Sequence, residues 1–297
     1  MFIIRYKNIF FAISGILVLL AITAMVYKGF NVGIDFTGGS MTEVSYTNAR
    51  PDIAKLEADL KDKFPGSHMQ IAGEKDLIVR TRDLTDKEHT DLVQALSDNN
   101  TSPLTEKQFS SIGPTIGKEL RSRAWAAILT VLLGIVLFIA FAFRKVSEPI
   151  SSWKYGLITM ISLTHDIIIP AGIFAYLGYE VNSLFVVGLL SILGISVHDK
   201  IVVFDRIREN LRLRVGATFG ETVGKSLEQT FARSINTSLT ILIVLGALWY
   251  LGPDSTRDFS MLLFTGVAIG TYSSVFFAAP LTVLAERFQT QPKKGKK

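Results

Sequence analysis

The feature that most constrains the fold of this chain is a set of long apolar stretches. A helix that crosses the hydrocarbon core of a bilayer needs about 20 mostly apolar residues. Stretches of this kind lie at residues 9–27, 124–143, 155–177, 182–204, 235–251 and 259–285. The chain is 48% hydrophobic, and its mean hydropathy of +0.36 is high for a water-soluble domain. The sequence therefore predicts a polytopic α-helical membrane protein with six transmembrane helices.

The first apolar stretch has a signal peptide as its alternative interpretation, because Arg5 and Lys7 precede it. Its apolar core is long, however, and the segment "YKGFNVGID" that follows lacks a small-x-small cleavage site. We therefore expect a cytoplasmic N-terminus at 1–8 and an uncleaved first span at 9–28.

The basic residues indicate the orientation, because cytoplasmic loops carry an excess of lysine and arginine. One set of loops and termini carries most of them, namely Arg5, Lys7, Arg144, Lys145, Lys154, Arg206, Arg208, Arg212, Arg214, Lys225, Arg233, Arg287 and the "KKGKK" tail. The other side carries Lys28, Lys118, Arg121, Arg123 and Arg257 near the span ends. Both termini are therefore expected on the cytoplasmic side of the membrane, with 288–297 as a basic tail.

The formal net charge of +5 is explained by this topology and by contact with anionic membrane lipids. A nucleic-acid partner is not expected. The chain has no cysteine, which excludes a disulfide framework and a thiolate metal site.

Residues 29–122 differ from the rest, because they are polar and lie on the outer side. "MTEVSYT", "HMQIAG", "DLIVRTRD" and residues 107–112 are typical of strands. "PDIAKLEADLKDKF" is an amphipathic helix with Ile53, Leu56, Leu60 and Phe64 on one face, and a second helix follows Thr85 and Glu88 at capping-box spacing. The order β-α-β-β-α-β predicts a small α+β ferredoxin-like extracytoplasmic domain. We expect His68 and His89 to be solvated surface residues.

The remaining spans form a predicted five-helix transmembrane bundle at 123–287, with a cytoplasmic loop at 205–232. In that loop Phe219, Val223, Leu227 and Phe231 recur at helical spacing. Such a stripe favours packing along the membrane face or the neighbouring bundle over binding of a soluble partner.

Small residues recur at every fourth position of the sixth span, at Gly266, Gly270, Ser274 and Ala278. A ridge of small side chains lets another helix approach closely. Packing within the chain is favoured over a subunit interface.

Ionisable residues inside the predicted spans are the strongest functional signal, because each costs about 2.5–3.5 kcal/mol at the bilayer centre on insertion scales. They are His165, Asp166, His198, Asp199, Lys200 and Arg233. A carboxylate at membrane depth must be neutralised by a proton or paired with a cation. The spans are therefore predicted to hold an Asp199–Arg233 ion pair, and histidine is suited to exchange protons near neutral pH.

A salt bridge that only holds helices in register is the alternative, and Lys200 is expected to snorkel to the cytoplasmic interface. Consecutive helical residues point about 100° apart, so His198, Asp199 and Lys200 do not all face one cavity. A proton-linked site is favoured energetically. One charge moved through 100 mV gains about 2.3 kcal/mol, which is of the order of the cost of burying it.

Several motifs together give the chain a family resemblance. They are "VGIDFTGGS", "SIGPTIGKEL", "DKIVVFDRIREN", "INTSLT" and "GTYSSVFFAAP", in this order from about residue 5 to 288. With the layout of six spans and one insert, they resemble the SecF family of the bacterial SecDF accessory translocase, part of the RND superfamily.

The resemblance implies a non-enzymatic subunit that pairs with SecD and associates with the SecYEG channel. It implies that the pair uses the proton-motive force to help move an exported polypeptide outward after the SecA ATPase. YajC and membrane lipids are further expected partners. No cofactor is expected; the proton is the expected coupling ion, with sodium as the alternative. Asp199, Arg233, His165 and Asp166 match the family's intramembrane residues.

The chain departs from the family at one motif. The family usually has Val-Asn-Asp-Thr where this chain has Val197, His198, Asp199 and Lys200. The histidine adds a titratable group beside the aspartate and fits a proton relay. The lysine places a positive charge beside the carboxylate. Two consequences stay open: the lysine weakens the coupling of Asp199 to protons, or its side chain only snorkels to the interface.

In the "GIDFTGGS" motif, Gly33, Gly38 and Gly39 allow backbone conformations that are closed to other residues. A hinge between the first span and the outer domain and a fixed tight turn are equally favoured. Asp35 is a candidate for capping a helix or binding a partner.

Two other functions are weighed against protein export. A small-molecule or lipid exporter of the same superfamily predicts a larger outer domain than this chain has. An intramembrane aspartyl hydrolase needs two carboxylates that share a proton, here Asp166 and Asp199. The expected arginine partner and the lack of a catalytic motif argue against it.

Overall fold

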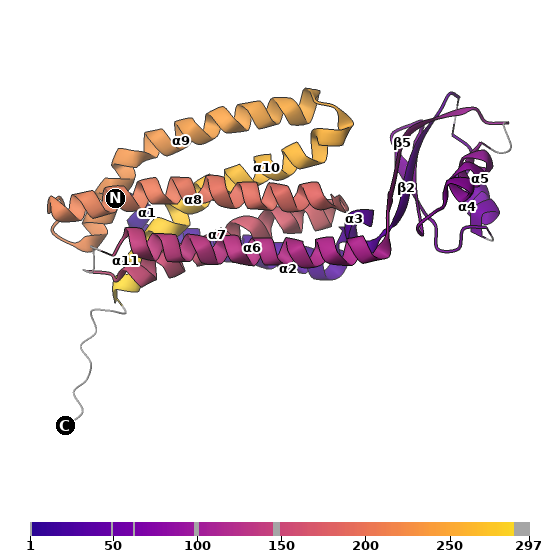
Figure 1. Ribbon diagram of the computed structural model, residues 1–297. Coiled ribbons are helices and arrows are strands. Elements are labelled where there is room, and N and C mark those ends of the chain that lie inside the picture. The colour runs from indigo at the N-terminus through magenta and orange to yellow at the C-terminus, as the bar shows by residue number, and fades with distance from the viewer. Residues whose placement is uncertain (1, 49, 62, 98–100, 145–148, 288–297) are drawn as a thin grey trace. The chain divides into compact units, whose positions relative to one another are not determined.

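The computed structural model describes residues 2–48, 50–61, 63–97, 101–144 and 149–287 (Figure 1). The chain divides into two compact units. Val32–Trp125 forms the outer unit, and Met1–Asn31 with Ala126–Lys297 forms the membrane unit. The predicted basic tail at 288–297 lies outside the described residues.

The membrane unit is a helical bundle. Its elements are α1 (Phe2–Arg5), α2 (Lys7–Lys28), the part of α6 (Pro114–Ala142) that follows Trp125, α7 (Ser152–Leu177), β6 (Glu180–Val181), α8 (Ser183–Arg212), α9 (Phe219–Leu251), α10 (Asp254–Ser273), the π-helix η1 (Ser274–Ala278) and α11 (Ala279–Arg287). Within the described residues, six helical segments are long and apolar enough to cross a membrane. The predicted set of six spans is confirmed.

The predicted cytoplasmic loop at 205–232 is mostly helical. α8 continues to Arg212, and α9 begins at Phe219, well before the apolar part of its span. The hydroxyl of Thr218 accepts a hydrogen bond from the Glu221 amide at 3.2 Å and so caps α9.

The apolar stripe at the start of α9 packs against the bundle. Phe219, Val223 and Leu227 are buried in a cluster with residues of α7, α8 and η1, whereas Phe231 is 40% exposed. The stripe therefore contributes to the core of this chain.

α10 occupies a central place, because it contacts α7, α8 and α9. A Cβ atom at Gly266 would overlap the Ile192 side chain, and one at Gly270 would lie 2.9 Å from Ser196 Oγ. The small-residue ridge thus lets α10 approach α8 closely. Its other two members, Ser274 and Ala278, are fully buried in η1. The ridge packs within this chain.

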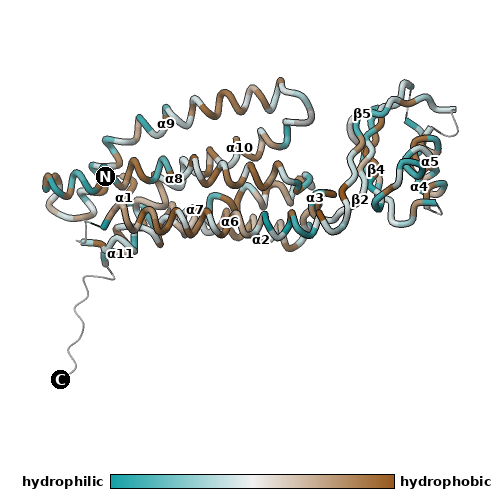
Figure 2. Tube along the Cα trace, in the orientation of Figure 1, coloured by the Kyte–Doolittle hydropathy of each residue, from teal (hydrophilic) through white to brown (hydrophobic). Residues whose placement is uncertain are grey.

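The helices of the bundle are largely apolar along their length (Figure 2). α2, α6 and α9 carry many exposed large hydrophobic side chains, among them Leu19, Leu129, Ile243 and Val244. Such surfaces are stable in contact with lipid or with other apolar helices, as a spanning bundle requires.

The outer unit is a small α+β domain. It contains α3 (Ile34–Thr37), β2 (Gly39–Tyr46), α4 (Ile53–Lys61), β3 (His68–Ala72), β4 (Asp76–Thr81), α5 (Asp86–Leu96) and β5 (Leu104–Ile112), while β1 (Asn31–Val32) lies at its boundary. The four-stranded sheet has the order β3-β4-β2-β5, antiparallel at each pairing. The predicted element order is confirmed, and the ferredoxin-like class stays a prediction.

The core of the outer unit forms where the predicted helix faces meet the sheet. The buried residues come from the α4 segment, from α5 and from β2, β4 and the turn after β4, namely Leu56, Leu60, Phe64, Leu92, Leu96, Val44, Tyr46, Leu77, Val79 and Leu84. Burial in a largely apolar site raises the pKa of the Tyr46 hydroxyl to about 12. That hydroxyl donates to the Leu96 carbonyl at 3.0 Å.

Thr85 begins α5 with the predicted capping box. The Glu88 amide donates to the Thr85 hydroxyl at 3.4 Å, and the Thr85 amide donates to the Glu88 carboxylate at 2.9 Å. The expectation for His68 holds, because it is exposed. The expectation for His89 is wrong. Its ring stacks on Phe109 at a centroid distance of 3.8 Å and lies 3.3 Å from a Glu106 oxygen.

Candidate functional site

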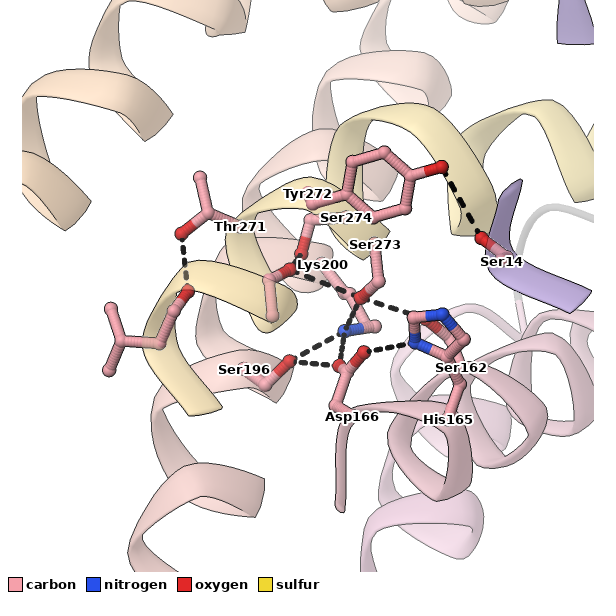
Figure 3. Close-up of polar contacts among 12 residues, drawn as sticks. Ser14, Ser162, His165, Asp166, Ser196, Lys200, Thr271, Tyr272, Ser273 and Ser274 are labelled. Atoms are coloured by element: carbon pink, nitrogen blue, oxygen red, sulfur yellow. Dashed lines mark hydrogen bonds and ion pairs between the residues drawn. The ribbon is translucent and has the colours of Figure 1, made fainter. Parts of the chain in front are cut away.

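A polar network lies buried between α7, α8 and α10 (Figure 3). At its centre is the ammonium of Lys200 on α8, whose side chain is 0% exposed. It donates to Asp166 Oδ2 at 2.5 Å, to Ser196 Oγ at 2.6 Å and to Ser273 Oγ at 3.1 Å. An ammonium has three donors, and each has an oxygen partner here. The structure corrects the expectation that Lys200 snorkels to the interface.

Asp166 on α7 is the counter-ion of Lys200 and is also 0% exposed. Its Oδ2 atom accepts a second hydrogen bond, from Ser196 at 2.5 Å, and its Oδ1 atom lies 3.0 Å from His165 Nδ1. A buried carboxylate is tolerated only when it is paired and hydrogen-bonded, and Asp166 meets both conditions.

His165 lies beside this ion pair with 4% of its side chain exposed. Its ring is stacked on Phe277 of η1 at a centroid distance of 5.0 Å. Nε2 is buried and has no hydrogen-bond partner among the described residues. The ring therefore has one nitrogen toward Asp166 and one that is available for a hydrogen bond to water.

Asp199 lies on a different face of α8 from Lys200 and contacts α9. Its Oδ1 atom accepts a hydrogen bond from Ser234 Oγ at 2.6 Å. Its Oδ2 atom is buried and has no hydrogen-bond partner among the residues that the structure describes. Asp199 is thus a half-buried carboxylate in which one oxygen accepts a hydrogen bond and the other has no partner among the described residues.

The predicted Asp199–Arg233 ion pair is absent from the described part of the chain, and this expectation is corrected. Arg233 is exposed, and its neighbour Ser234 is the α9 residue that contacts Asp199. His198 is exposed as well. The 100° step between consecutive helical residues is the reason: His198, Asp199 and Lys200 point to three different environments.

Sequence reasoning missed that Lys200 belongs to the buried face of α8. The buried residues Ile192, Ser196, Lys200, Val203 and Ile207 follow one another at steps of three or four. A helix buries residues at that spacing on one face. The spacing of Lys200 from these buried residues predicts that it is buried too. Its positive charge favoured the opposite interpretation, an exposed side chain.

Asp166 and Asp199 do not form a shared-proton pair. Asp166 contacts Lys200 and Ser196 of α8, whereas Asp199 contacts Ser234 of α9. Among the described residues, no group of three or more His, Cys, Asp and Glu side chains is placed to hold a metal ion. Because the two described carboxylates have separate partners, they do not form the carboxylate pair that aspartyl chemistry needs.

The glycine motif forms a tight turn inside the outer unit. Gly38 and Gly39 have φ values of 75° and 115°, which favour glycine. A Cβ atom at Gly39 would overlap the Thr81 carbonyl oxygen, and one at Gly38 would lie 2.8 Å from Pro114 Cα. Gly33 has an ordinary φ of −72° before α3, and Asp35 lies in the first turn of that helix. These contacts favour the fixed turn over the hinge.

The fold and this site define a class: a multi-pass helical membrane protein with a charged centre buried among its spans. Ionisable residues in such positions mark functional sites by default.

Comparison with known families identifies the chain further. Residues 92–287 match the family described as "Protein export membrane protein SecD/SecF, C-terminal", and residues 24–49 match the "SecD/SecF GG Motif". The "Protein translocase subunit SecF" of Thermobaculum terrenum is 36% identical over an alignment of 297 positions. The alignment covers 95% of this chain and 92% of that protein. The SecF subunit of Pseudomonas aeruginosa is 34% identical, covering 92% and 87%. The chain therefore belongs to the SecF family of protein translocase subunits.

A solved structure has the same fold. The crystal structure of SecDF from Thermus thermophilus, "a translocon-associated membrane protein", superposes with a TM-score of 0.83 at 32% identity. The match covers 96% of this chain and 38% of the SecDF chain, so this chain spans little more than a third of that protein's length. These relatives favour protein translocation over the small-molecule exporter.

Proposed function

We propose that this chain is a SecF-like, non-enzymatic subunit that pairs with SecD and uses the proton-motive force to assist SecYEG- and SecA-dependent protein translocation. The fused SecDF relative supports the pairing, since this chain matches only 38% of it. We place the protein in the bacterial plasma membrane with both termini in the cytoplasm, in keeping with its basic loops.

The observation that carries this proposal is the unsatisfied oxygen of Asp199. A buried carboxylate oxygen without a hydrogen-bond partner costs about 1–3 kcal/mol or more. Protonation of Oδ2 removes the buried negative charge and so relieves part of this cost, while Ser234 continues to donate its hydrogen bond to Oδ1. Asp199 is therefore the proposed proton-exchanging carboxyl group.

Arg233 offers a second partner for the charged form of Asp199. Arg233 directly precedes Ser234 on α9. A rotation of α9 by about 100° therefore exchanges the two side chains at Asp199. In this mechanism the protonated carboxyl keeps Ser234, and the ionised carboxylate draws Arg233 toward it. Proton exchange is thereby converted into movement of α9 against α8.

The energy available is of the right order for such a step. Moving one charge through a potential of 100 mV is worth about 2.3 kcal/mol, and burying one charge costs about 2.5–3.5 kcal/mol on insertion scales. The membrane potential is therefore sufficient to shift a balance between two packings.

The other titratable residues have proposed roles around this step. His198, exposed and adjacent in sequence to Asp199, passes protons between the carboxyl group and water. His165 and Asp166 form a second centre that is neutralised by Lys200. That centre holds α7, α8 and α10 together while α9 moves.

The proposal is tested with Asp199→Asn in cells that depend on this chain for export. We expect loss of the part of export that depends on the proton gradient, because asparagine cannot exchange a proton. The matched control is Asp205→Asn, which removes a carboxylate from the same helix where it pairs with Arg208 near the surface. Normal gradient-dependent export in Asp199→Asn would contradict the mechanism, and loss in both variants would mean that the effect is not specific to Asp199.

A further inference from the structure

The surroundings of the Lys200 ammonium are those of a bound cation. Nζ donates three hydrogen bonds, all to oxygens: a carboxylate on α7 (Asp166), a hydroxyl on α8 (Ser196) and a hydroxyl on α10 (Ser273). None of the four residues is more than 3% exposed. One positive charge therefore lies against one negative charge in a closed, all-oxygen cage.

The cage is held in place by contacts that do not involve Lys200. Ser162 Oγ donates to Ser273 Oγ at 3.3 Å, and Ser273 Oγ donates to the Gly270 carbonyl at 3.1 Å. The absence of a Cβ at Gly270 lets α10 approach Ser196. The regular helix changes to the π-helix η1 directly after Ser273, and such bulges are frequent at functional sites. The oxygens therefore keep a converging arrangement through neighbouring helices.

The composition of the cage fits a monovalent cation. Oxygen atoms, carboxylate oxygens above all, are the ligands of hard cations. A single carboxylate balances a single positive charge. Within the described residues the groups of several acidic side chains that a divalent ion favours are lacking.

We infer that Asp166, Ser196 and Ser273 form a monovalent-cation site that the chain fills with its own tethered cation, the Lys200 ammonium. External sodium is excluded from this site as long as the ammonium occupies it. Removal of the lysine side chain opens the site to sodium or to free ammonium ions. The inference concerns ion binding and does not depend on the proposed export function.

The test measures the melting temperature of the full-length protein in lipid nanodiscs in sodium, ammonium or choline chloride at equal ionic strength. Wild-type protein is expected to show equal Tm in the three salts. Lys200→Ala is expected to melt about 3 °C or more higher in sodium or ammonium than in choline at about ten times the Kd, because a ligand that binds only the folded state stabilises it. Choline is too large to enter.

Further variants show whether the ion binds at the cage itself. Lys200→Met fills the space without a charge and should show no response to sodium. In the Lys200→Ala background, Asp166→Asn should abolish the response, whereas Asp199→Asn should keep it. Equilibrium binding of radioactive sodium provides a second measurement, and it should find about one ion per chain in Lys200→Ala and none in wild type.

Several results would overturn the inference. They are a sodium response in wild type equal to that of Lys200→Ala, no response in Lys200→Ala, a response that survives Asp166→Asn, or a Lys200→Ala protein that is unfolded in all three salts. The last counts against the site because a vacated cage should accept sodium and fold. Since no readout involves export, failure here and failure of the proposed function are distinguishable.

Discussion

The Lys200–Asp166 ion pair allows a quantitative test by a double-mutant cycle. The two single variants are Lys200→Met and Asp166→Asn, and the third variant combines them. Each single change leaves one charged group buried without its partner, since both side chains are 0% exposed. The combined change replaces the pair with two neutral groups of similar size.

The expected magnitudes follow from this burial. Removing one partner of a buried pair costs about 3–5 kcal/mol, whereas replacing both is often neutral or stabilising by about 1–4 kcal/mol. For chains of about 150–250 residues, 1 kcal/mol corresponds to about 2–4 °C in Tm. We therefore expect each single variant to melt roughly 6–20 °C below wild type and the double variant to melt close to wild type.

The assay is thermal unfolding of the full-length protein in nanodiscs, monitored by circular dichroism in choline chloride. Ser191→Ala is a suitable control. Its hydroxyl donates to the Val187 carbonyl of its own helix at 2.8 Å, and it is not one of the partners of Lys200 or Asp166. Single losses that add in the double variant would refute the proposed pairing, because additive losses mean that the two charges do not interact.

Two further predictions concern the outer unit. Gly39→Ala should lower the yield of folded protein, because a Cβ atom at this residue, whose φ is 115°, would overlap the Thr81 carbonyl oxygen. Gly73→Ala is the control, because Gly73 also has a positive φ but has open space around it. Equal yields for the two variants would contradict the close approach of Gly39 to Thr81. The second concerns acid, because hydrogen bonds from Arg82 and then Thr85 lower the pKa of Glu88 to about 2. Its stabilising effect is complete above the usual value of 4.5 and is lost as pH falls through about 2, so cleavage of α5 by pepsin should rise over this range in wild type. In Glu88→Gln the rise should be smaller, and identical profiles would argue against a role for this carboxylate.

Much of the fold follows from periodicity in the sequence. The six spans are long enough that length and apolar content alone identify them. In the outer unit, the Thr85 capping box and the apolar face of Leu56, Leu60 and Phe64 predict two helices where α5 and α4 are found. Local signals suffice for these elements because each is coded within a short stretch of chain.

The arrangement of the site follows from tertiary packing, which local patterns do not contain. The rotation of α8 decides that Lys200 rather than Asp199 enters the bundle, and the rotation of α9 decides that Ser234 rather than Arg233 contacts Asp199. The π-helix η1 also depends on packing, because its sequence, Ser-Val-Phe-Phe-Ala, contains no glycine or proline that would mark it. A one-residue difference in helix rotation redirects a side chain by about 100°, so identifying the ionisable residues did not identify their partners.

The central claim is that Asp199 binds and releases a proton within the folded bundle. Infrared difference spectroscopy of the protein in nanodiscs, between neutral and acidic buffer, measures this directly through the carbonyl band of a protonated carboxyl group. We expect wild type to show one component of this band, beyond the signals of the chain's other carboxyl groups, that is missing in Asp199→Asn and retained in Asp205→Asn. Identical difference spectra for wild type and Asp199→Asn would contradict proton exchange at this residue.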